Sequence, residues 1–225
     1  MLVLDLFSGL GGWSAAFKDR GHTVITVDIE KKFNPTICKD IMQLSRNDFN
    51  GHKFDIILAS PPCNCFSVAS VYRHWNKDTH MPKDQATYES IKLVGHTVDL
   101  IMQLFPRWWI LENPRGMMRN VLGLPSQTVF YAAYGDWKLK PTDLWGRLPD
   151  VEWKKPVKWE KAPRGSKQGV QGIDGRYCKA YPENMCLKVR TPELRAIVPY
   201  GLSMAICLAC ERELQPCSFH GVVNE

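Results

Sequence analysis

The sequence lacks several features that mark membrane and secreted proteins. It has no apolar run near the roughly 18 residues that a membrane-spanning helix needs, so we expect no membrane partner. An apolar, strand-like run starts at Leu2, and we therefore expect no signal peptide. The sequence also has no internal repeats. These absences favour a cytoplasmic protein.

The 8 cysteines follow no spacing typical of a disulfide-bonded scaffold. We therefore expect reduced thiols, as in a cytoplasmic compartment. Cys207 and Cys210 with Cys217, and Cys178 with Cys186, have spacings that a zinc site could use. Cys207 and Cys210 fall within an apolar helical pattern, however, where two core-facing thiols are the simpler interpretation. We expect no metal.

Composition and charge are those of a globular protein with a basic bias. The 225 residues suffice for one well-buried domain, or one domain with a small appendage. The net charge of +6 suits a polyanionic partner without requiring one. Lysines and arginines crowd residues 154–167, interleaved with Trp153 and Trp159. This segment is either a nucleic-acid contact surface or a solvated loop anchored by two tryptophans.

One stretch presents a reactive residue type at the end of a predicted strand. The apolar run Phe54–Leu58 indicates a buried strand, which Pro61 and Pro62 end because proline cannot donate a ladder hydrogen bond. Cys63 follows at the carboxyl end of that strand, where open α/β sheets bind their ligands. Cys63 is therefore a candidate nucleophile. The alternative is a small buried hydrophobic residue.

The beginning of the chain predicts a cofactor cradle. A strand at residues 2–7 is followed by a glycine-rich turn and a helix at residues 13–20 that ends at Gly21. Glycines let a cofactor approach the backbone, and a helix N-terminus offers free N–H groups. The spacing is not that of the dinucleotide fingerprint, so NAD is not favoured.

Two aspartates end the next two predicted strands. Asp28 follows the strand at residues 23–28 and is suited to bind a ribose diol, with Glu30 as the alternative. Asp40 lies near the end of a short strand at residues 36–41, where it is suited to accept a hydrogen bond from an adenine amino group. Each aspartate could instead cap the helix that follows it.

The rest of the chain predicts further α/β elements and a second catalytic carboxylate. A helix is expected over residues 83–104 and a buried strand over 108–111, which places Glu112 at a strand end near Cys63. Residues 68–81 have no clear period and are interpreted as a loop over the site. We expect a strand pair at 127–134 and 139–145, and two helices after Thr191.

Four motifs in this order resemble the DNA (cytosine-5) methyltransferase family. They are Asp5-Leu6-Phe7-Ser8-Gly9-Leu10-Gly11-Gly12, Pro62-Cys63-Asn64-x-Phe66-Ser67, Glu112-Asn113-Pro114 and Gly201-Leu202-Ser203. The brevity of the chain and residues 140–145 are most similar to short members found in phages. The resemblance implies an α/β, Rossmann-like, S-adenosylmethionine-dependent methyltransferase fold. Such a fold has a mixed, mostly parallel seven-stranded sheet with helices on both faces.

The resemblance also implies the chemistry. The Cys63 thiolate adds to C6 of cytosine, and Glu112 contacts N3 and the exocyclic amine while N3 becomes protonated. C5 then attacks the methyl group of S-adenosylmethionine, and loss of the C5 proton with elimination of Cys63 releases the product. The thiol needs a lowered pKa, which a nearby cation or helix N-terminus would provide. The base must be flipped out of the duplex.

Position by position, the family's sites transfer to sixteen further residues. The implied cofactor-binding residues are Phe7, Ser8, Gly9, Leu10, Gly12, Asp28, Ile29, Asp40, Ile41, Pro62 and Ser203. The implied substrate-binding residues are Asn64, Ser67, Asn113, Lys138 and Lys140.

The chain departs from the family pattern at three places. Asn64 stands where a glutamine is usual, and Leu202 replaces an asparagine near the amino-acid end of the cofactor. The family's arginine pair is missing, and Lys138 or Lys140 is the expected substitute. A large target-recognition domain is absent as well. We divide the chain into a catalytic and cofactor-binding domain (1–149), a reduced target-recognition insertion (150–188) and C-terminal helices that complete the catalytic domain (189–225).

These features predict an enzyme that methylates C5 of cytosine in double-stranded DNA. Its setting would be a bacterium or a phage-infected host cell, with restriction–modification as one possible context. Two alternatives stay open. One is an RNA (tRNA) cytosine-5 methyltransferase, and the other is a non-catalytic homologue that binds the cofactor and DNA without turnover.

Overall fold

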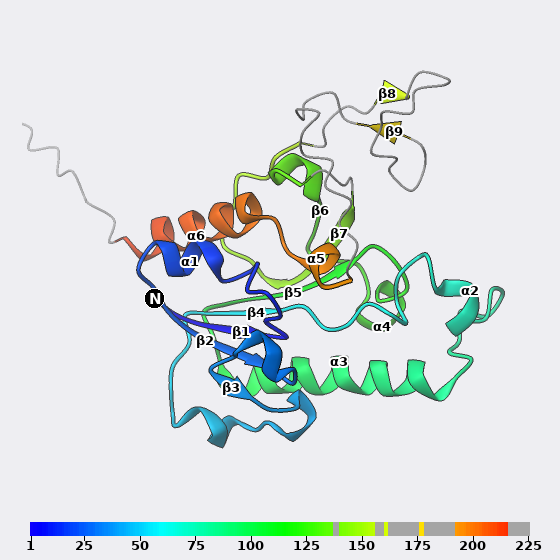
Figure 1. The fold of residues 1–225 in the computed structure, drawn as a ribbon, viewed down its shortest axis with the longest axis horizontal. Coiled ribbons are helices and arrows are strands. Elements are labelled where there is room, and N and C mark those ends of the chain that lie inside the picture. Colours follow the sequence, from blue (N-terminus) through cyan, green and yellow to red (C-terminus); the bar gives the residue numbers. More distant parts are fainter. Residues whose placement is uncertain (137–139, 156–159, 162–175, 178–191, 216–225) are drawn as a thin grey trace, which may run out of the picture.

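A seven-stranded sheet forms the centre of the molecule (Figure 1). The computed structural model describes residues 1–136, 140–155, 160–161, 176–177 and 192–215. The strand order is β3-β2-β1-β4-β5-β7-β6. The strands are β1 (Leu2–Leu6), β2 (Thr23–Asp28), β3 (Ile37–Cys38), β4 (Ile56–Ala59), β5 (Trp108–Pro114), β6 (Gln127–Phe130) and β7 (Pro141–Arg147).

The pairings within β1 to β5 are all parallel, whereas β7 is antiparallel to both β5 and β6. The sheet is therefore mixed and mostly parallel, as the sequence predicted. Parallel strands end at the same edge, so the segments after β1, β2 and β4 meet there with the end of β5. This edge collects most of the residues that the motifs singled out.

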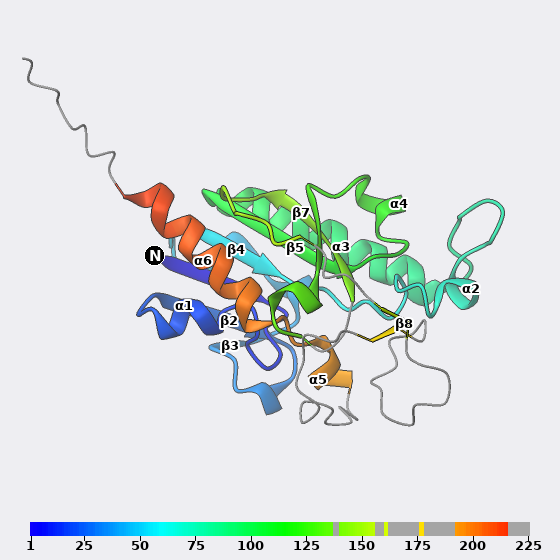
Figure 2. The ribbon, with the colours of Figure 1, turned by 90° about the horizontal axis from the view of Figure 1, so that it is seen from above.

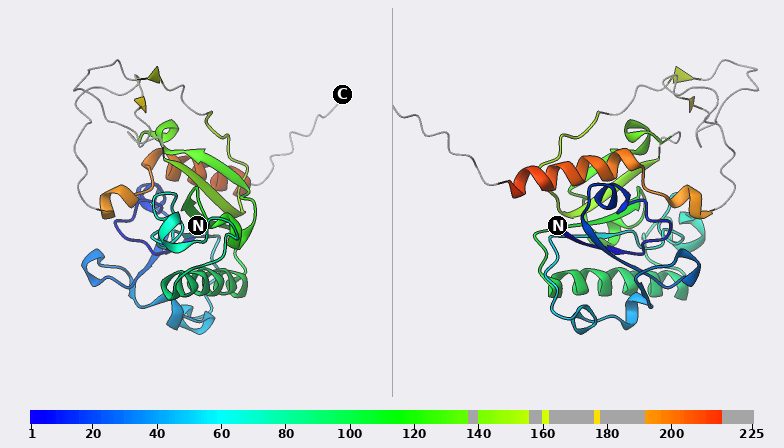
Figure 3. Two further views of the ribbon diagram at one scale, coloured as in Figure 1. Left: turned by 90° about the vertical axis from the view of Figure 1, so that its right-hand side faces the viewer. Right: turned by 60° about the vertical axis from the view of Figure 1, so that its left-hand side comes forward.

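Helices cover both faces of the sheet (Figures 1 and 2). On one face, Val3 and Ile56 pack with Leu202 and Ile206 of α6. On the other, alternate strand residues such as Ile57 pack against α3. Figure 3 shows the same layering from two further directions. The helices are α1 (Ala15–Asp19), α2 (Val71–His74), α3 (Gln85–Leu104), α4 (Arg119–Leu122), α5 (Pro192–Ala196) and α6 (Tyr200–Leu214), with short 3₁₀ helices η1 (Lys31–Phe33), η2 (Ile41–Gln43), η3 (Arg46–Phe49) and η4 (Tyr131–Tyr134).

Local signals explain the bounds of the long helix α3. Asp84 is its N-cap, because its Oδ1 accepts a hydrogen bond of 2.8 Å from the Thr87 backbone N–H. The helix ends at Phe105, which has a left-handed φ of 50° and precedes Pro106. No helix among the described residues is long and apolar enough to cross a membrane.

Three predicted segments differ from the structure. The third strand is only Ile37–Cys38, because Asp40 turns the chain by capping η2. The expected loop at residues 68–81 contains the short helix α2. The pair at 127–134 and 139–145 does form as β6 and β7, but η4 ends the first strand at Phe130.

The predicted insertion at 150–188 is described only in small part. Residues 150–155 and the two-residue strands β8 (Glu160–Lys161) and β9 (Arg176–Tyr177), which pair antiparallel, are within the described residues. The remainder, including Lys158, Arg164 and Lys167, lies outside them. The domain boundaries therefore stay a prediction.

Candidate active site

The Cys63 turn is fixed by backbone and side-chain hydrogen bonds at the end of β4. The backbone N–H groups of Phe66 and Ser67 both donate to the Cys63 carbonyl at 3.0 Å. Asn113 of β5 donates its Nδ2 to the Pro61 carbonyl at 2.9 Å, and its side chain is fully buried. Asn113, which the resemblance assigned to the substrate, is thus a residue that holds the nucleophile's turn.

The Cys63 thiol is half-buried beside a carboxylate and a lysine. Burial, and next the negative charge of Glu112, raise the pKa of Cys63 above its usual value. The positive charge of Lys140 opposes this shift. The cation expected from the sequence is therefore present, but the other two effects outweigh it. In the absence of substrate, Cys63 is a protonated thiol at neutral pH.

The Glu112 carboxylate accepts a hydrogen bond on each of its two oxygens. Ser60 Oγ donates to Oε2 at 2.8 Å, and the Tyr131 hydroxyl donates to Oε1 at 2.9 Å. Trp13 Nε1 in turn donates to Ser60 Oγ at 2.7 Å. Glu112 is only 4% exposed, so these donors replace water around a buried charge. Glu112 belongs to β5 itself, opposite Leu144 of β7, rather than following the strand.

Lys140 completes the group around Cys63 and Glu112. Its Nζ lies 4.4 Å from the centroid of the Tyr131 ring. The pKa of Tyr131 is raised well above its usual value, chiefly by burial and then by the charge of Glu112. Tyr131 is therefore a neutral hydroxyl donor. The other lysine predicted here, Lys138, lies outside the described residues.

The glycine-rich turn after β1 is tied to the end of β2. Asp28 accepts a hydrogen bond of 2.8 Å from the Gly9 backbone N–H and one of 2.9 Å from that of Glu30. Phe7 has a φ of 59°, an uncommon conformation for a residue with a side chain. Asp28 therefore shapes the turn, and the second lone pair of each oxygen is left for a ligand.

Apolar side chains are exposed beside this turn. Leu10 is 52% and Ile29 62% exposed, while Phe7 and Ser8 are half-buried. An adenine or methionine moiety could cover such side chains, as the resemblance implies for them. Asp40 accepts from the Met42 N–H at 2.9 Å as the cap of η2. Ile41 is 3% exposed and packs in the core beneath.

Two residues that the resemblance assigns to the cofactor also have packing roles. A Cβ at Gly12 would come within 2.8 Å of backbone atoms of Val198, so glycine is needed for this close approach. Ser203 is fully buried, accepts from the Ala16 N–H and donates to the Trp13 carbonyl. Gly12 and Ser203 thus join α6 and the segment before it to the beginning of α1. Leu202 is a core residue.

The remaining predicted residues lie around the Cys63 turn. Pro62 and Asn64 are exposed. Ser67 is half-buried, shares a 3.0 Å hydrogen bond with the Ser70 hydroxyl and bridges to Gly116. A Cβ at Gly116 would lie 2.1 Å from the Phe66 carbonyl oxygen, which excludes a side chain there. These contacts hold the segment after Cys63 against the end of β5.

Sequence reasoning missed Trp13, Ser60 and Tyr131 as parts of the site. A usable signal was present for the two aromatic residues. Trp13 and Tyr131 each lie next to an apolar segment, which predicts burial. Buried Trp and Tyr side chains normally find a hydrogen-bond partner for their polar atom. Ser60 gave no such signal, because a serine before a proline is an ordinary strand end.

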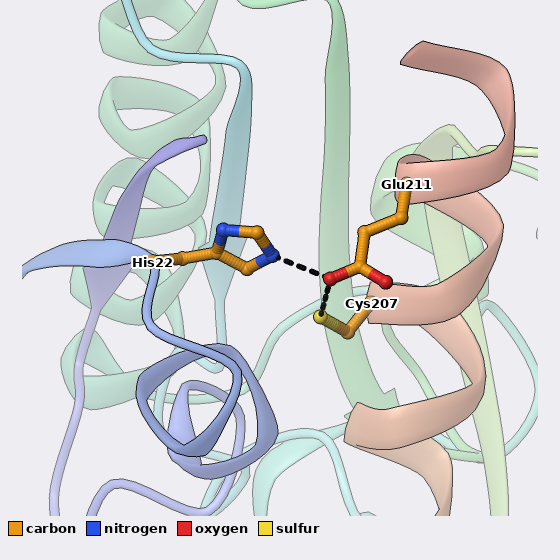
Figure 4. Close-up of side chains that lie close together, drawn as sticks. All are labelled: His22, Cys207 and Glu211. Carbon is orange, nitrogen blue, oxygen red and sulfur yellow. Dashed lines mark hydrogen bonds and ion pairs between the residues drawn. The ribbon is translucent and has the colours of Figure 1, made fainter. Parts of the chain in front are cut away.

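A second cluster lies where the turn before β2 meets α6 (Figure 4). One side-chain N, O or S atom from each of His22, Cys207 and Glu211 lies within 4.8 Å of the others. His22 Nε2 lies 2.8 Å from Glu211 Oε1. Arg20 donates to both Glu211 oxygens, at 2.7 and 2.6 Å. Burial and the Glu211 charge raise the pKa of Cys207 to about 12, the opposite of what a ligand thiolate needs.

We therefore interpret this cluster as an ion-paired contact that fastens α6 to the turn before β2. Cys207 and Cys210 are core residues of α6, in agreement with the simpler sequence interpretation. The other cysteines of the zinc alternative, Cys178, Cys186 and Cys217, lie outside the described residues.

Comparisons with known proteins point to one family. Residues 1–129 match the family model of the C-5 cytosine-specific DNA methylases. The chain is 32% identical over 154 residues to the "Probable DNA (cytosine-5)-methyltransferase" of frog virus 3 (isolate Goorha), covering 64% of this chain and 70% of that protein.

Two further relatives are matched over a smaller part of their length. The type II methyltransferase M.XorII of Xanthomonas oryzae is 27% identical, over 51% of this chain and 28% of that protein. The mouse (Mus musculus) tRNA (cytosine(38)-C(5))-methyltransferase is 26% identical, over 63% of this chain and 36% of that protein. The matched region of the family model spans more than half of this chain and includes the turn after β1, Cys63 and Glu112. The chain therefore belongs to the C-5 cytosine-specific DNA methylase family.

Proposed function

We propose that this chain transfers a methyl group from S-adenosylmethionine to C5 of cytosine in double-stranded DNA. The observation that carries the proposal is the placement of Cys63 and Glu112 on neighbouring strands. Cys63 lies four residues after the end of β4, and Glu112 directly follows Leu111, the β5 residue that pairs with the last residue of β4. A nucleophile and a carboxylate that act on the same cytosine ring must lie close to each other. The turn after β1, on the other side of β4, is suited to hold the methyl donor.

Cys63 attacks C6 of the flipped cytosine. The S–C6 bond forms, and the ring electrons move toward N3, which takes up a proton. Because burial and Glu112 favour the thiol, the proton has to leave sulfur as the attack begins, and Lys140 favours the resulting thiolate. Later, loss of the C5 proton and cleavage of the S–C6 bond regenerate Cys63, and N3 gives up its proton to leave the neutral base.

Glu112 recognises the edge of the base that bears N3 and the amine. A carboxylate held by Ser60 and Tyr131 can still accept one hydrogen bond on each oxygen. Protonated N3 and the exocyclic amine present two neighbouring N–H donors. Glu112 therefore stabilises the protonated ring as charge develops.

The residues around the first turn fit S-adenosylmethionine. Asp28 has lone pairs for the ribose hydroxyls, and Leu10 and Ile29 expose apolar surface for the uncharged parts of the molecule. The backbone of Gly9 allows close approach. When bound, the cofactor supplies the methyl group.

DNA is favoured over RNA by the family model and by the frog virus 3 relative, of which this chain covers 70%. The tRNA relative is less similar and covered over 36%. The reacting atoms of cytosine are stacked within a duplex, so base flipping is part of the proposal. A role in a restriction–modification system accords with the relatives named type II methyltransferases.

The test is sequencing of a plasmid from cells that express the chain, with bisulfite conversion and mass spectrometry of the nucleosides. We expect 5-methylcytosine in one short context, lost in Cys63→Ala and kept in Glu89→Gln, a substitution on the exposed face of α3. Transcribed tRNA is assayed in parallel. Methylation of tRNA alone would establish the RNA alternative. A folded protein that binds S-adenosylmethionine and modifies neither would establish the non-catalytic alternative.

A further inference from the structure

Glu112 is the last acceptor in a chain of side chains drawn from three separate parts of the sequence. Trp13 precedes α1, Ser60 follows β4, and Tyr131 begins η4. We infer that Ser60 and Tyr131 are positioning residues that hold the Glu112 carboxylate in the orientation needed to recognise the base. We also infer that Trp13 fixes the direction of the Ser60 hydroxyl. The inference rests on the proposed function for the role of Glu112.

The direction of the chain follows from the chemistry of its groups. An indole N–H can only donate, so Ser60 Oγ accepts from Trp13 at 2.7 Å. The single Ser60 hydroxyl proton is then directed to Glu112 Oε2, 2.8 Å away. Trp13 is 3% exposed, so water does not readily replace Ser60 as its partner. The Ser60 hydroxyl is thus held in one orientation.

Tyr131 acts on the other carboxylate oxygen. Its side chain is fully buried, and its hydroxyl donates to Glu112 Oε1 at 2.9 Å. Its hydroxyl stays protonated across the working pH range, because burial and the Glu112 charge both oppose its ionisation. Glu112 therefore has one fixed donor on each oxygen.

Kinetics of Tyr131→Phe test this role against a matched variant. Tyr134 lies on the same short helix η4, is 3% exposed, and its hydroxyl accepts from the Lys154 N–H at 3.1 Å. Tyr134→Phe thus removes a similar buried hydroxyl that does not contact Glu112. We expect Tyr131→Phe to lower kcat by about 10- to 100-fold, within the range for a misplaced catalytic group. KM values for DNA and S-adenosylmethionine should stay within about twofold, because the hydroxyl does not bind either substrate.

Rescue by a conservative variant separates a positioning role from a purely structural one. Ser60→Ala should lower kcat like Tyr131→Phe and leave the KM values unchanged, because it too removes one donor from Glu112. Ser60→Thr, which keeps a hydroxyl, should recover most of the rate. Wild-type kinetics in both Tyr131→Phe and Ser60→Ala would overturn the inference.

Infrared spectroscopy of the protein without DNA gives a second readout that does not depend on activity. The Glu112 carboxylate band is assigned by its absence in Glu112→Gln. Because the frequency of a carboxylate stretch depends on the hydrogen bonds that the group accepts, we expect the band to shift in Tyr131→Phe and not in Tyr134→Phe. An unchanged band overturns the inference even if the wild type methylates DNA. A shifted band in a protein that methylates no nucleic acid refutes the proposed function and keeps the assignment of the two donors.

Discussion

The two halves of the site are built in different ways. Around β1 and β2 the backbone makes the site: a turn with left-handed residues, held by Asp28, beside the exposed side chains of Leu10 and Ile29. Around β5 and β7 side chains make it, and their polar atoms bond to one another. Glu112 has a donor on each oxygen, and the buried Asp143 is bonded by Arg119 and Thr128.

This difference matches what the proposed function requires of each half. A half that takes up and releases a cofactor needs surface that is uncovered between turnovers. A half that stabilises charge on a reacting ring needs its donors and acceptors oriented in advance. The first half should therefore tolerate substitutions at modest cost to stability, and the second should not.

The largest expected effect on stability comes from breaking the Asp143 ion pair. Arg119 of α4 donates to the fully buried Asp143 carboxylate through Nε at 2.6 Å and Nη2 at 2.7 Å. In Asp143→Asn, the guanidinium loses its charged partner while the shape of the side chain is kept. We expect the free energy of unfolding to fall by about 2–4 kcal/mol, measured by urea denaturation.

The exposed pair Glu89–Lys92 on α3 is the control for this prediction. Glu89→Gln should change the free energy of unfolding by less than about 0.5 kcal/mol. Equal effects of the two substitutions would contradict the distinction between the halves, because both pairs would then behave as surface contacts.

The sequence predicted the backbone-built half much better than the side-chain-built half. Apolar runs and glycine or proline breaks are local signals, and they placed β1, β2 and β4 within two residues. The hydrogen bond between Trp13 and Ser60 joins residues 47 positions apart, and that between Ser60 and Glu112 joins residues 52 apart. Such contacts depend on the strand order, which places β4 between β1 and β5, and no local pattern specifies them.

Some residues in the motifs also serve packing. The family's motifs assign Gly12 and Ser203 to the cofactor, and their neighbours in the structure are Val198, Trp13 and Ala16. A motif marks positions where few residue types fit. It does not separate a position that touches a ligand from one that lets two segments approach closely.

The cofactor half contains a buried carboxyl group, that of Asp5, with one oxygen that accepts no hydrogen bond from the described residues. Its effect on the free energy of unfolding should be intermediate. Asp5 Oδ2 accepts from the Ser14 hydroxyl at 2.6 Å, whereas the buried Oδ1 has no partner among the described residues. Burial raises the pKa of Asp5 from 3.8 to about 7. The folded state thus binds a proton that the unfolded state has already released.

Stability should therefore fall as the pH rises from about 4 toward 7. The contribution of protonated Asp5 is fully present below the unfolded pKa and is lost as the pH passes the folded value. Between pH 5 and 7 the expected loss is about 2 kcal/mol. Asp5→Asn does not titrate, so its free energy of unfolding should depend less on pH by this amount. Parallel pH curves for the two proteins would show that Asp5 is ionised in the folded state.

The smallest effect on stability is expected at Ile29. A substitution there should alter cofactor binding rather than the free energy of unfolding. Ile29 is 62% exposed beside Asp28, so Ile29→Ala should change the free energy of unfolding by less than about 0.5 kcal/mol. A bound adenine would cover the side chain, and its loss should weaken S-adenosylmethionine binding by about five- to tenfold. Isothermal titration calorimetry measures this change.

Leu124→Ala is the control, because Leu124 is 86% exposed just before β6, at the opposite edge of the sheet. If both variants bind the cofactor like the wild type, Ile29 is not covered by it, and the exposed apolar surface of this half needs another explanation.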